Sequence, residues 1–167
     1  GYKVTPHCPR CGTSLSSHEV ALGYEDAEDP SDYIKFKIDP RYEYMIATLI
    51  WPTEVKFSLD KPAYFLAWTT TPWTLPGNTA LAVAPDAEYV IVEVENEYLI
   101  LASARQEAVG LKDYKIVERL KGSDLVGLYY ERLYDIPIAY SKEDKKRGYR
   151  VIEGDFVSMD DGTGIVH

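Results

Sequence analysis

The clearest hydrophobic pattern in the chain is an alternation at residues 33–38, where isoleucine and phenylalanine alternate with lysine. A period of two residues is typical of a half-buried strand. Residues 63–68 instead form a continuous apolar run rich in aromatic side chains, which predicts a buried strand. Residues 88–93 and 98–102 predict two more strands, joined as a hairpin at 95–97.

Shorter elements complete the predicted fold. The spacing of Ser103 and Gln106 fits a capping box and predicts a helix that ends at Gly110. Residues 44–51 fit either a short helix or a strand. Additional strands are predicted at residues 17–24, 80–83, 114–119, 149–153, 155–159 and 163–167, with a hairpin turn at 161–162 before the last. Many short strands with few helices predict a mainly β fold, either a barrel or a sandwich.

A threonine-rich segment follows the apolar run. The threonines at 69–71 place three hydroxyls where the strand should open, and Pro72 and Pro76 stop it from continuing because they lack an N–H. Gly77 permits a turn before apolar chain resumes. A strand, a rigid polar loop and a second strand suit the binding of a small polar ligand against an apolar wall. A threonine-rich strand end with a simple proline turn explains the same residues.

Composition narrows the class of partner. The 167 residues suffice for one domain with a proper core, and the net charge of −9 argues against broad binding to duplex nucleic acid. A few nucleotides of a single-stranded end need only a local basic or aromatic patch. No apolar window is long enough to span a bilayer, so we expect no membrane-spanning segment and no membrane as a partner. The start at Gly1 shows neither an initiator Met nor a signal peptide, and with the end at His167 it suggests a piece of a longer protein.

The two cysteines form the pattern of half a zinc knuckle. Cys8 and Cys11 are separated by two residues on a predicted tight turn that Gly12 helps to close. Structural zinc takes four ligands, and only His7 and His18 are near in sequence. The pair is therefore half a site or a pair of free thiols. Two cysteines make no disulfide framework, so a reducing cytoplasm is expected.

The residues alone show no hydrolase machinery. The sequence contains no G-x-S-x-G elbow, no zinc-protease helix and no cysteine beside a catalytic base. Composition and spacing therefore support a ligand-binding barrel as well as an enzyme.

The exact order of residues in the threonine segment is more specific than its composition. Residues 68–80 resemble the threonine-rich signature of the editing domain inserted in isoleucyl-tRNA synthetases. The related valyl enzymes typically carry Arg-Pro-Glu at 71–73, where this chain has Thr-Pro-Trp. The resemblance extends to residues 8–12 and 17–20 near the start and to 161–167 at the close, so it covers nearly the whole chain.

The resemblance implies a fold and a domain organisation. We expect a small closed β-barrel of the valyl, isoleucyl and leucyl editing-domain type, with a few short helices and an extended N-terminal arm. Residues 1–16 would form the arm with the half zinc knuckle, and 17–167 the editing domain, with a peripheral insertion near 39–62. A second cysteine pair would follow in the parent synthetase and complete the zinc site with Cys8 and Cys11.

The resemblance also implies an activity. The family pocket takes the aminoacylated 3′-terminal adenosine of tRNA and hydrolyses the ester. The catalytic positions would be Thr70 and Thr71, which bind the ribose and ester or position the attacking water. The substrate-binding positions would be Thr69, Trp73, Thr74, Asn78 and His167.

Three of these positions have finer roles in the family. Trp73 and Thr74 would line the amino-acid side-chain pocket, and His167 would exclude the larger amino acid. The family carries an essential aspartate beyond this histidine, and Asp160 and Asp161 are not its equivalents. We therefore expect the isolated piece to keep the fold yet hydrolyse poorly.

The implied function is hydrolysis of valyl-tRNA(Ile), and of valyl-adenylate as a second substrate, by a cytoplasmic isoleucine–tRNA ligase. The partners would be the 3′ end of tRNA(Ile) carrying valine and the remainder of the synthetase, with the piece itself a monomer. The editing site would need no cofactor, while ATP and magnesium would serve only the aminoacylation domain. Two alternatives are a valyl editing domain that clears threonine and a non-enzymatic, zinc-assisted interaction module.

Overall fold

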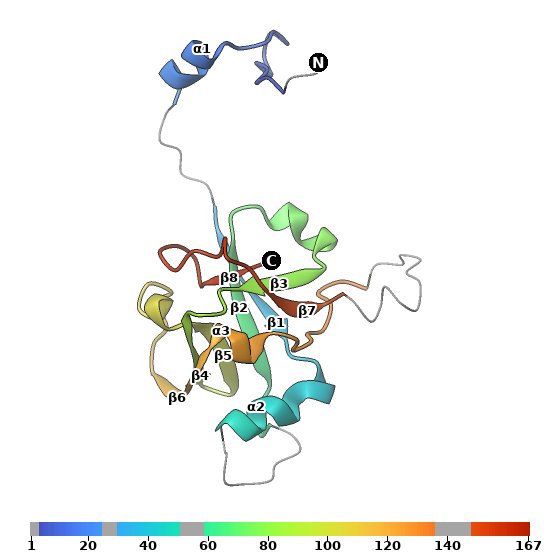
Figure 1. The fold of residues 1–167 in the computed structure, drawn as a ribbon, viewed down its shortest axis with the longest axis vertical. Helices are drawn as coiled ribbons and strands as arrows, with labels where there is room; N and C mark the ends of the chain where they lie inside the picture. The colour runs from blue at the N-terminus through green and yellow to red at the C-terminus, as the bar shows by residue number, and fades with distance from the viewer. Residues whose placement is uncertain (1–3, 25–29, 51–58, 136–147) are drawn as a thin grey trace. The chain divides into compact units, whose positions relative to one another are not determined.

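The computed structural model describes residues 4–24, 30–50, 59–135 and 148–167 (Figure 1). The chain divides into two compact units, Gly1–Pro30 and Ser31–His167. This division falls later in the chain than the boundary after residue 16 that the sequence predicts.

The first unit contains a tight turn and one helix. Cys8 N donates to Thr13 O at 2.9 Å, and Gly12, with a positive φ of 69°, donates its N–H to Cys8 O. The helix α1 spans Ser17–Leu22, so the strand predicted at 17–24 is wrong. A capping box explains the helix, because Ser16 Oγ accepts from Glu19 N and the Glu19 carboxylate accepts from Ser16 N.

The second unit is built on a five-stranded sheet in the order β1-β2-β5-β4-β6. All neighbours are antiparallel except β2 and β5, which are parallel. The strands are β1 (Asp32–Lys37), β2 (Ala63–Thr69), β4 (Glu88–Val94), β5 (Glu97–Ala102) and β6 (Tyr114–Lys121). The predicted strands in these regions and the hairpin between β4 and β5 are confirmed.

A second sheet of three strands carries the end of the chain. Its order is β7-β3-β8, comprising β7 (Arg150–Glu153), β3 (Ala80–Val83) and β8 (Ile165–Val166). β3 pairs in parallel with β7 and antiparallel with β8. The last hairpin predicted around 161–162 is wrong, because β8 pairs with the distant β3. Residues 155–159 form turns and bends, so the strand predicted there is also wrong.

The two sheets are joined without closing into a barrel. The isolated bridges Ile38↔Tyr130 and Tyr129↔Arg150 connect the β1 edge to β7. Among the described residues, no ladder joins β8 to β6 at the other side, so the predicted mainly β fold is confirmed and the closed barrel is not.

The helices of the second unit are short. The helix predicted from Ser103 is only a 3₁₀ turn, followed by further turns to Gly110. The region 44–51 is helical as far as residue 50. The elements are η1 (Pro40–Tyr42), α2 (Glu43–Ile50), η2 (Pro72–Gly77), η3 (Ser103–Arg105) and α3 (Gly122–Leu125).

The helix α2 lies in the region expected to be a peripheral insertion. It lies at the opposite end of the unit from the turn at 72–77 (Figure 1). Its Ile46 and Ala47 are fully buried, so the described part of this region packs on the core.

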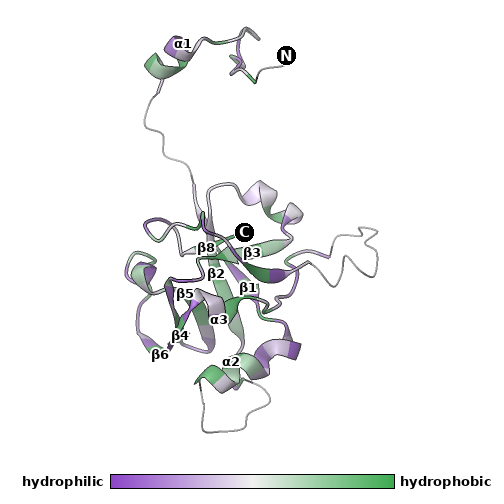
Figure 2. Cartoon of the chain, viewed as in Figure 1, coloured by the Kyte–Doolittle hydropathy of each residue, from purple (hydrophilic) through white to green (hydrophobic). Residues whose placement is uncertain are grey.

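Both faces of the central strands are covered. Tyr89 and Ile91 of β4 face the main core, whereas Val90 and Val92 face a smaller cluster on the other side of the sheet. Successive side chains of a strand point to opposite faces, so an unbroken apolar strand requires cover on both. The green colour of the central strands in Figure 2 follows from this double burial.

The segment before β8 is fixed by its backbone carbonyls. Arg105 donates to Gly162 O at 3.0 Å and to Asp160 O at 2.6 Å, and Ala102 N donates to Thr163 O at 2.8 Å. Gly164 has a φ of 73°, and a Cβ there would lie 2.4 Å from Ala102 Cβ. Glycine is therefore required at 164 both by conformation and by space.

We predict that Gly164→Ala destabilises the chain more than Gly110→Ala. Gly110 has a φ of 72° but open space around its missing Cβ, so it reports the backbone cost alone. That shared cost is about 1–2 kcal/mol in the free energy of unfolding. Overpacking against Ala102 should add about 1–3 kcal/mol at Gly164 only. Denaturant unfolding of both variants measures the difference, and equal losses would contradict the close contact.

Candidate functional site

The site begins where β2 ends at Thr69. The Thr69 side chain is only 4% exposed, and its Oγ1 lies 2.8 Å from Nε2 of His167. The same oxygen accepts a hydrogen bond from Thr71 N at 3.1 Å. Because the hydroxyl also has one proton to donate, it suits a neutral imidazole that carries its proton on Nδ1 and accepts at Nε2. This contact joins residues 98 positions apart in the chain.

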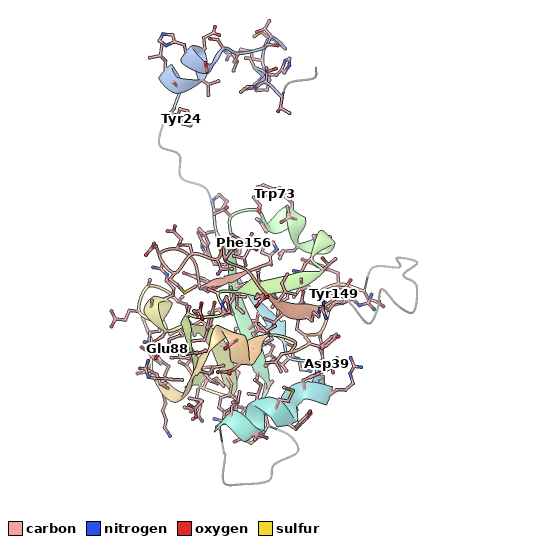
Figure 3. All side chains as sticks on the ribbon, viewed as in Figure 1. Tyr24, Asp39, Trp73, Glu88, Tyr149 and Phe156 are labelled. Atoms are coloured by element: carbon pink, nitrogen blue, oxygen red, sulfur yellow. The ribbon has the colours of Figure 1, made fainter. Side chains whose placement is uncertain are left out.

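The turn η2 follows directly and displays the remaining threonines. Thr74 N and Thr74 Oγ1 both donate to Thr71 O, at 3.0 and 2.7 Å. Buried Leu75 anchors the turn, while Trp73 is 73% exposed (Figure 3). Thr70 and Thr71 are also exposed. The two prolines thus place hydroxyls and an aromatic ring at the surface.

The hydroxyls of the segment form a short series. Thr71 Oγ1 lies 3.5 Å from Thr69 Oγ1 and 3.4 Å from Thr74 Oγ1. The series runs from the buried histidine contact to the exposed turn. Such a row of hydroxyls can hold a water molecule or a sugar hydroxyl.

A pocket of about 400 Å³ adjoins this turn. Three predicted site residues line it, namely Thr74, Asn78 and His167. Thr69 contacts the pocket wall through His167, while Thr70, Thr71 and Trp73 are not among the described residues that line it. The other lining residues are Gly77, Thr79, Ala80, Ala82, Ile152, Phe156 and Val166.

The apolar wall of the pocket was not predicted. Ala82 of β3 pairs with Ile152 of β7 and with Val166 of β8, which brings three separate segments together. In β3 the large Leu81 and Val83 are fully buried in the core, so the small Ala80 and Ala82 face the opposite side and leave space. The alternation of small and large residues at 80–83 is a signal in the sequence from which this wall could have been found.

Phe156 completes the wall from a turn. Its side chain is 68% exposed (Figure 3), and it follows Gly154, where a Cβ would lie 2.9 Å from the Phe156 ring. Glycine at 154 therefore lets the ring approach the pocket. Sequence reasoning placed Phe156 in a strand and missed this role.

Burial sets the charge state of the imidazole. The pKa of His167 is lowered from its usual value because burial penalises the charged ring. The neutral form therefore predominates at pH 7 and can accept a hydrogen bond from the Thr69 hydroxyl.

The cysteine turn fits half of a metal site. Cys11 Sγ lies 3.0 Å from Thr13 Oγ1, and this hydrogen bond is the main cause that lowers the pKa of Cys11 to about 7. A cysteine binds zinc as its thiolate, so a lowered pKa favours the form that can act as a ligand. In the part of the chain that the structure describes, no group of three or more His, Cys, Asp or Glu side chains is placed to hold a metal. The zinc half-site at Cys8 and Cys11 stays a prediction.

Comparison with known proteins decides the family. No protein-family model matches the chain. The chain is 48% identical over its full length to an isoleucine–tRNA ligase of Dehalococcoides mccartyi and 45% identical to one of Clostridium tetani. It covers 17% and 14% of those ligases. The fold matches the leucyl-tRNA synthetase editing domain of P. knowlesi with a TM-score of 0.59 and 18% identity, over 85% of this chain and 58% of that one. The chain belongs to the isoleucyl-tRNA synthetase editing-domain family.

The editing domain of P. falciparum cytosolic leucyl-tRNA synthetase has the same fold, with a TM-score of 0.58 and 16% identity over 82% of this chain and 60% of that one. At this identity the likeness concerns the fold alone. Within the described residues of the present editing domain, every helix is too short or too polar to cross a bilayer.

We predict that His167 titrates below pH 6.5, its ordinary value, because burial favours the neutral ring. As the pH falls below 6.5 the unfolded chain binds the proton first, so the free energy of unfolding decreases until the folded ring also titrates. The imidazole signals in an NMR titration give the midpoint. His167→Gln should remove this part of the acid sensitivity, and a midpoint at or above 6.5 would contradict a buried neutral ring.

Proposed function

We propose that this editing domain hydrolyses valyl-tRNA(Ile) within an isoleucyl-tRNA synthetase. The main support is the Thr69–His167 hydrogen bond, which fixes the imidazole at the wall of a small, mostly apolar pocket. The 3′-terminal ribose would lie on the threonine turn, with the amino-acid side chain against Ala80 and Ala82. Valyl-adenylate is a second substrate of the same chemistry.

The hydroxyl series supports the catalytic step. Ester hydrolysis requires a water molecule oriented toward the carbonyl carbon and hydrogen-bond donors near the developing oxyanion. Thr71 lies in the middle of the series, between Thr69 and Thr74, and Thr74 lines the pocket. Thr70 is exposed and precedes Thr71 directly in the chain. We assign Thr70 and Thr71 to hold the ester and the attacking water, a role that needs no metal or cofactor of the domain's own.

Selectivity follows from the pocket wall. A single binding site discriminates weakly between side chains that differ by one methylene, a limit for which isoleucyl-tRNA synthetase is itself a standard example. A second site that admits valine and collides with isoleucine multiplies the discrimination. The ring of His167 cannot move aside without breaking its hydrogen bond to Thr69. It is therefore suited to exclude the larger isoleucine side chain. Trp73, on the exposed turn, would cover the bound substrate.

The proposed setting is the cytoplasm. The partners are the 3′ end of tRNA(Ile) and the rest of the synthetase, whose aminoacylation domain would use ATP and magnesium. Zinc at Cys8 and Cys11 would require two further ligands from outside this chain. The domain itself would act as a monomer.

We predict that the double substitution Thr70→Val and Thr71→Val in the full synthetase slows deacylation of valyl-tRNA(Ile) by about tenfold or more. The loss of two positioned hydroxyls removes hydrogen bonds worth about 1 kcal/mol each. Thr48→Val is the matched control, since Thr48 is also exposed and its hydroxyl donates to Tyr44 O within α2. Single-turnover deacylation rates measure the effect. A non-enzymatic module would show no deacylation in the wild type, and unchanged rates in the double variant would exclude these threonines from the reaction.

We predict that His167→Ala makes the synthetase hydrolyse isoleucyl-tRNA(Ile), which the wild type spares. A rigid wall imposes about 1–3 kcal/mol on an oversized group, and removing the ring relieves this collision. Parallel deacylation assays with valyl- and isoleucyl-tRNA measure the selectivity. Equal loss of both activities would instead make His167 a catalytic or structural group, and continued protection of isoleucyl-tRNA would assign the exclusion to other residues.

A further inference from the structure

The carboxamide of Asn78 has a defined orientation at the pocket. Its Nδ2 lies 2.9 Å from the backbone oxygen of Ala80, and its Oδ1 lies 2.6 Å from the hydroxyl of Tyr130. A backbone carbonyl can only accept, so the nitrogen and not the oxygen must face Ala80. The oxygen then faces Tyr130, whose hydroxyl must donate.

Tyr130 is rigidly held. Its side chain is 2% exposed, and its ring meets Phe36 edge-on at 5.2 Å and Tyr149 edge-on at 6.1 Å. Its backbone N–H donates to Tyr149 O at 3.0 Å. Burial is the main cause that raises the pKa of Tyr130, so the phenol keeps its proton and stays a donor.

These two contacts leave Asn78 with one defined capability. Within the part of the chain that the structure describes, the amide donates one hydrogen bond, to Ala80 O, and it has two N–H groups. The second N–H is therefore left for a ligand, while the carbonyl oxygen is engaged by Tyr130. Asn78 lines the 400 Å³ pocket, so a ligand group beside it must be a hydrogen-bond acceptor.

We propose that Tyr130 is a positioning residue that locks Asn78 as a donor toward a non-reacting acceptor oxygen of the substrate, such as a ribose hydroxyl. This inference rests on the proposed editing function. Without the Tyr130 hydroxyl, the carboxamide loses the contact that holds its oxygen and rotates more freely. The substrate would then bind less well, while the reacting ester and its water would be unaffected.

The test is steady-state deacylation of valyl-tRNA(Ile) by the full synthetase. Tyr130→Phe should raise KM about fivefold to tenfold, the effect of one lost hydrogen bond, with kcat changed less than about twofold. In an Asn78→Ala background the same substitution should have almost no further effect, because Tyr130 acts through Asn78. Partial misfolding would do the reverse, since it lowers kcat and leaves KM unchanged.

Tyr98→Phe is the matched control. Tyr98 is also 2% exposed, and its hydroxyl donates to Asp60 Oδ1 at 2.8 Å. Tyr98 pairs with Ala63 at the start of β2, six residues and about 20 Å of strand away from Thr69. We expect its KM and kcat to match the wild type.

An NMR measurement on the 167-residue chain tests, independently of activity, whether Tyr130 orients the Asn78 carboxamide. The Asn78 side-chain N–H signals should shift and exchange faster with solvent in Tyr130→Phe, and not in Tyr98→Phe. Unchanged Asn78 signals, a fall in kcat without a rise in KM, or an undiminished effect in the Asn78→Ala background would each overturn the inference. A wild-type synthetase that deacylates nothing would overturn the proposed function instead, and the NMR result would still decide whether Tyr130 orients Asn78.

Discussion

The buried hydroxyl of Tyr89 is the contact on which the arrangement of the two sheets depends. Tyr89 belongs to β4 of the large sheet, yet its hydroxyl accepts from Ala84 N just after β3 and donates to Gly164 O just before β8. Burial raises the pKa of this phenol, so it stays a donor. Three segments thus share one fully buried oxygen, and its removal would leave two backbone groups without their partner. His167 follows Gly164 by three residues, so this contact holds the backbone that leads to the imidazole, and Thr69 holds the ring itself.

The same arrangement explains why the pocket lies at the smaller sheet. β3 is the central strand of that sheet. Its large side chains, Leu81 and Val83, pack into the main core, so the side chains that face outward are the alanines. Two flanking strands and the Phe156 turn then supply apolar walls around those small side chains. The polar groups come from the turn that precedes β3 and from the residue that follows β8. An apolar floor with hydroxyl, amide and imidazole groups at its rim is typical of a site that orients a small ligand.

The strands with a strong local pattern were predictable, and the long-range pairings were not. The alternation at 33–38 and the apolar run at 63–68 depend only on which faces are buried, and both are confirmed as strands. Residues 155–159 have strand-like composition, yet they pair with no strand in the described part of the chain, and composition does not reveal pairing partners. The helix at Ser17–Leu22 was missed, although Ser16 and Glu19 have the spacing of a capping box. Thr69 and His167 were assigned to one site only through the family resemblance. Tyr130 reaches Asn78, and Phe156 reaches the pocket, through packing that no local pattern encodes.

The parallel pairing of β3 with β7 also bears on how the domain folds. β3 pairs with a strand some seventy residues further along the chain, whereas β4 and β5 are joined by a two-residue turn. Closing so long a loop carries an entropy cost before any contact forms, so such pairings form late in folding and open early in unfolding. The hairpin core can therefore exist before the ligand pocket does. Local opening of β7 and β8 would dismantle the pocket while the large sheet remains intact, so ligand binding and local unfolding are linked in this domain.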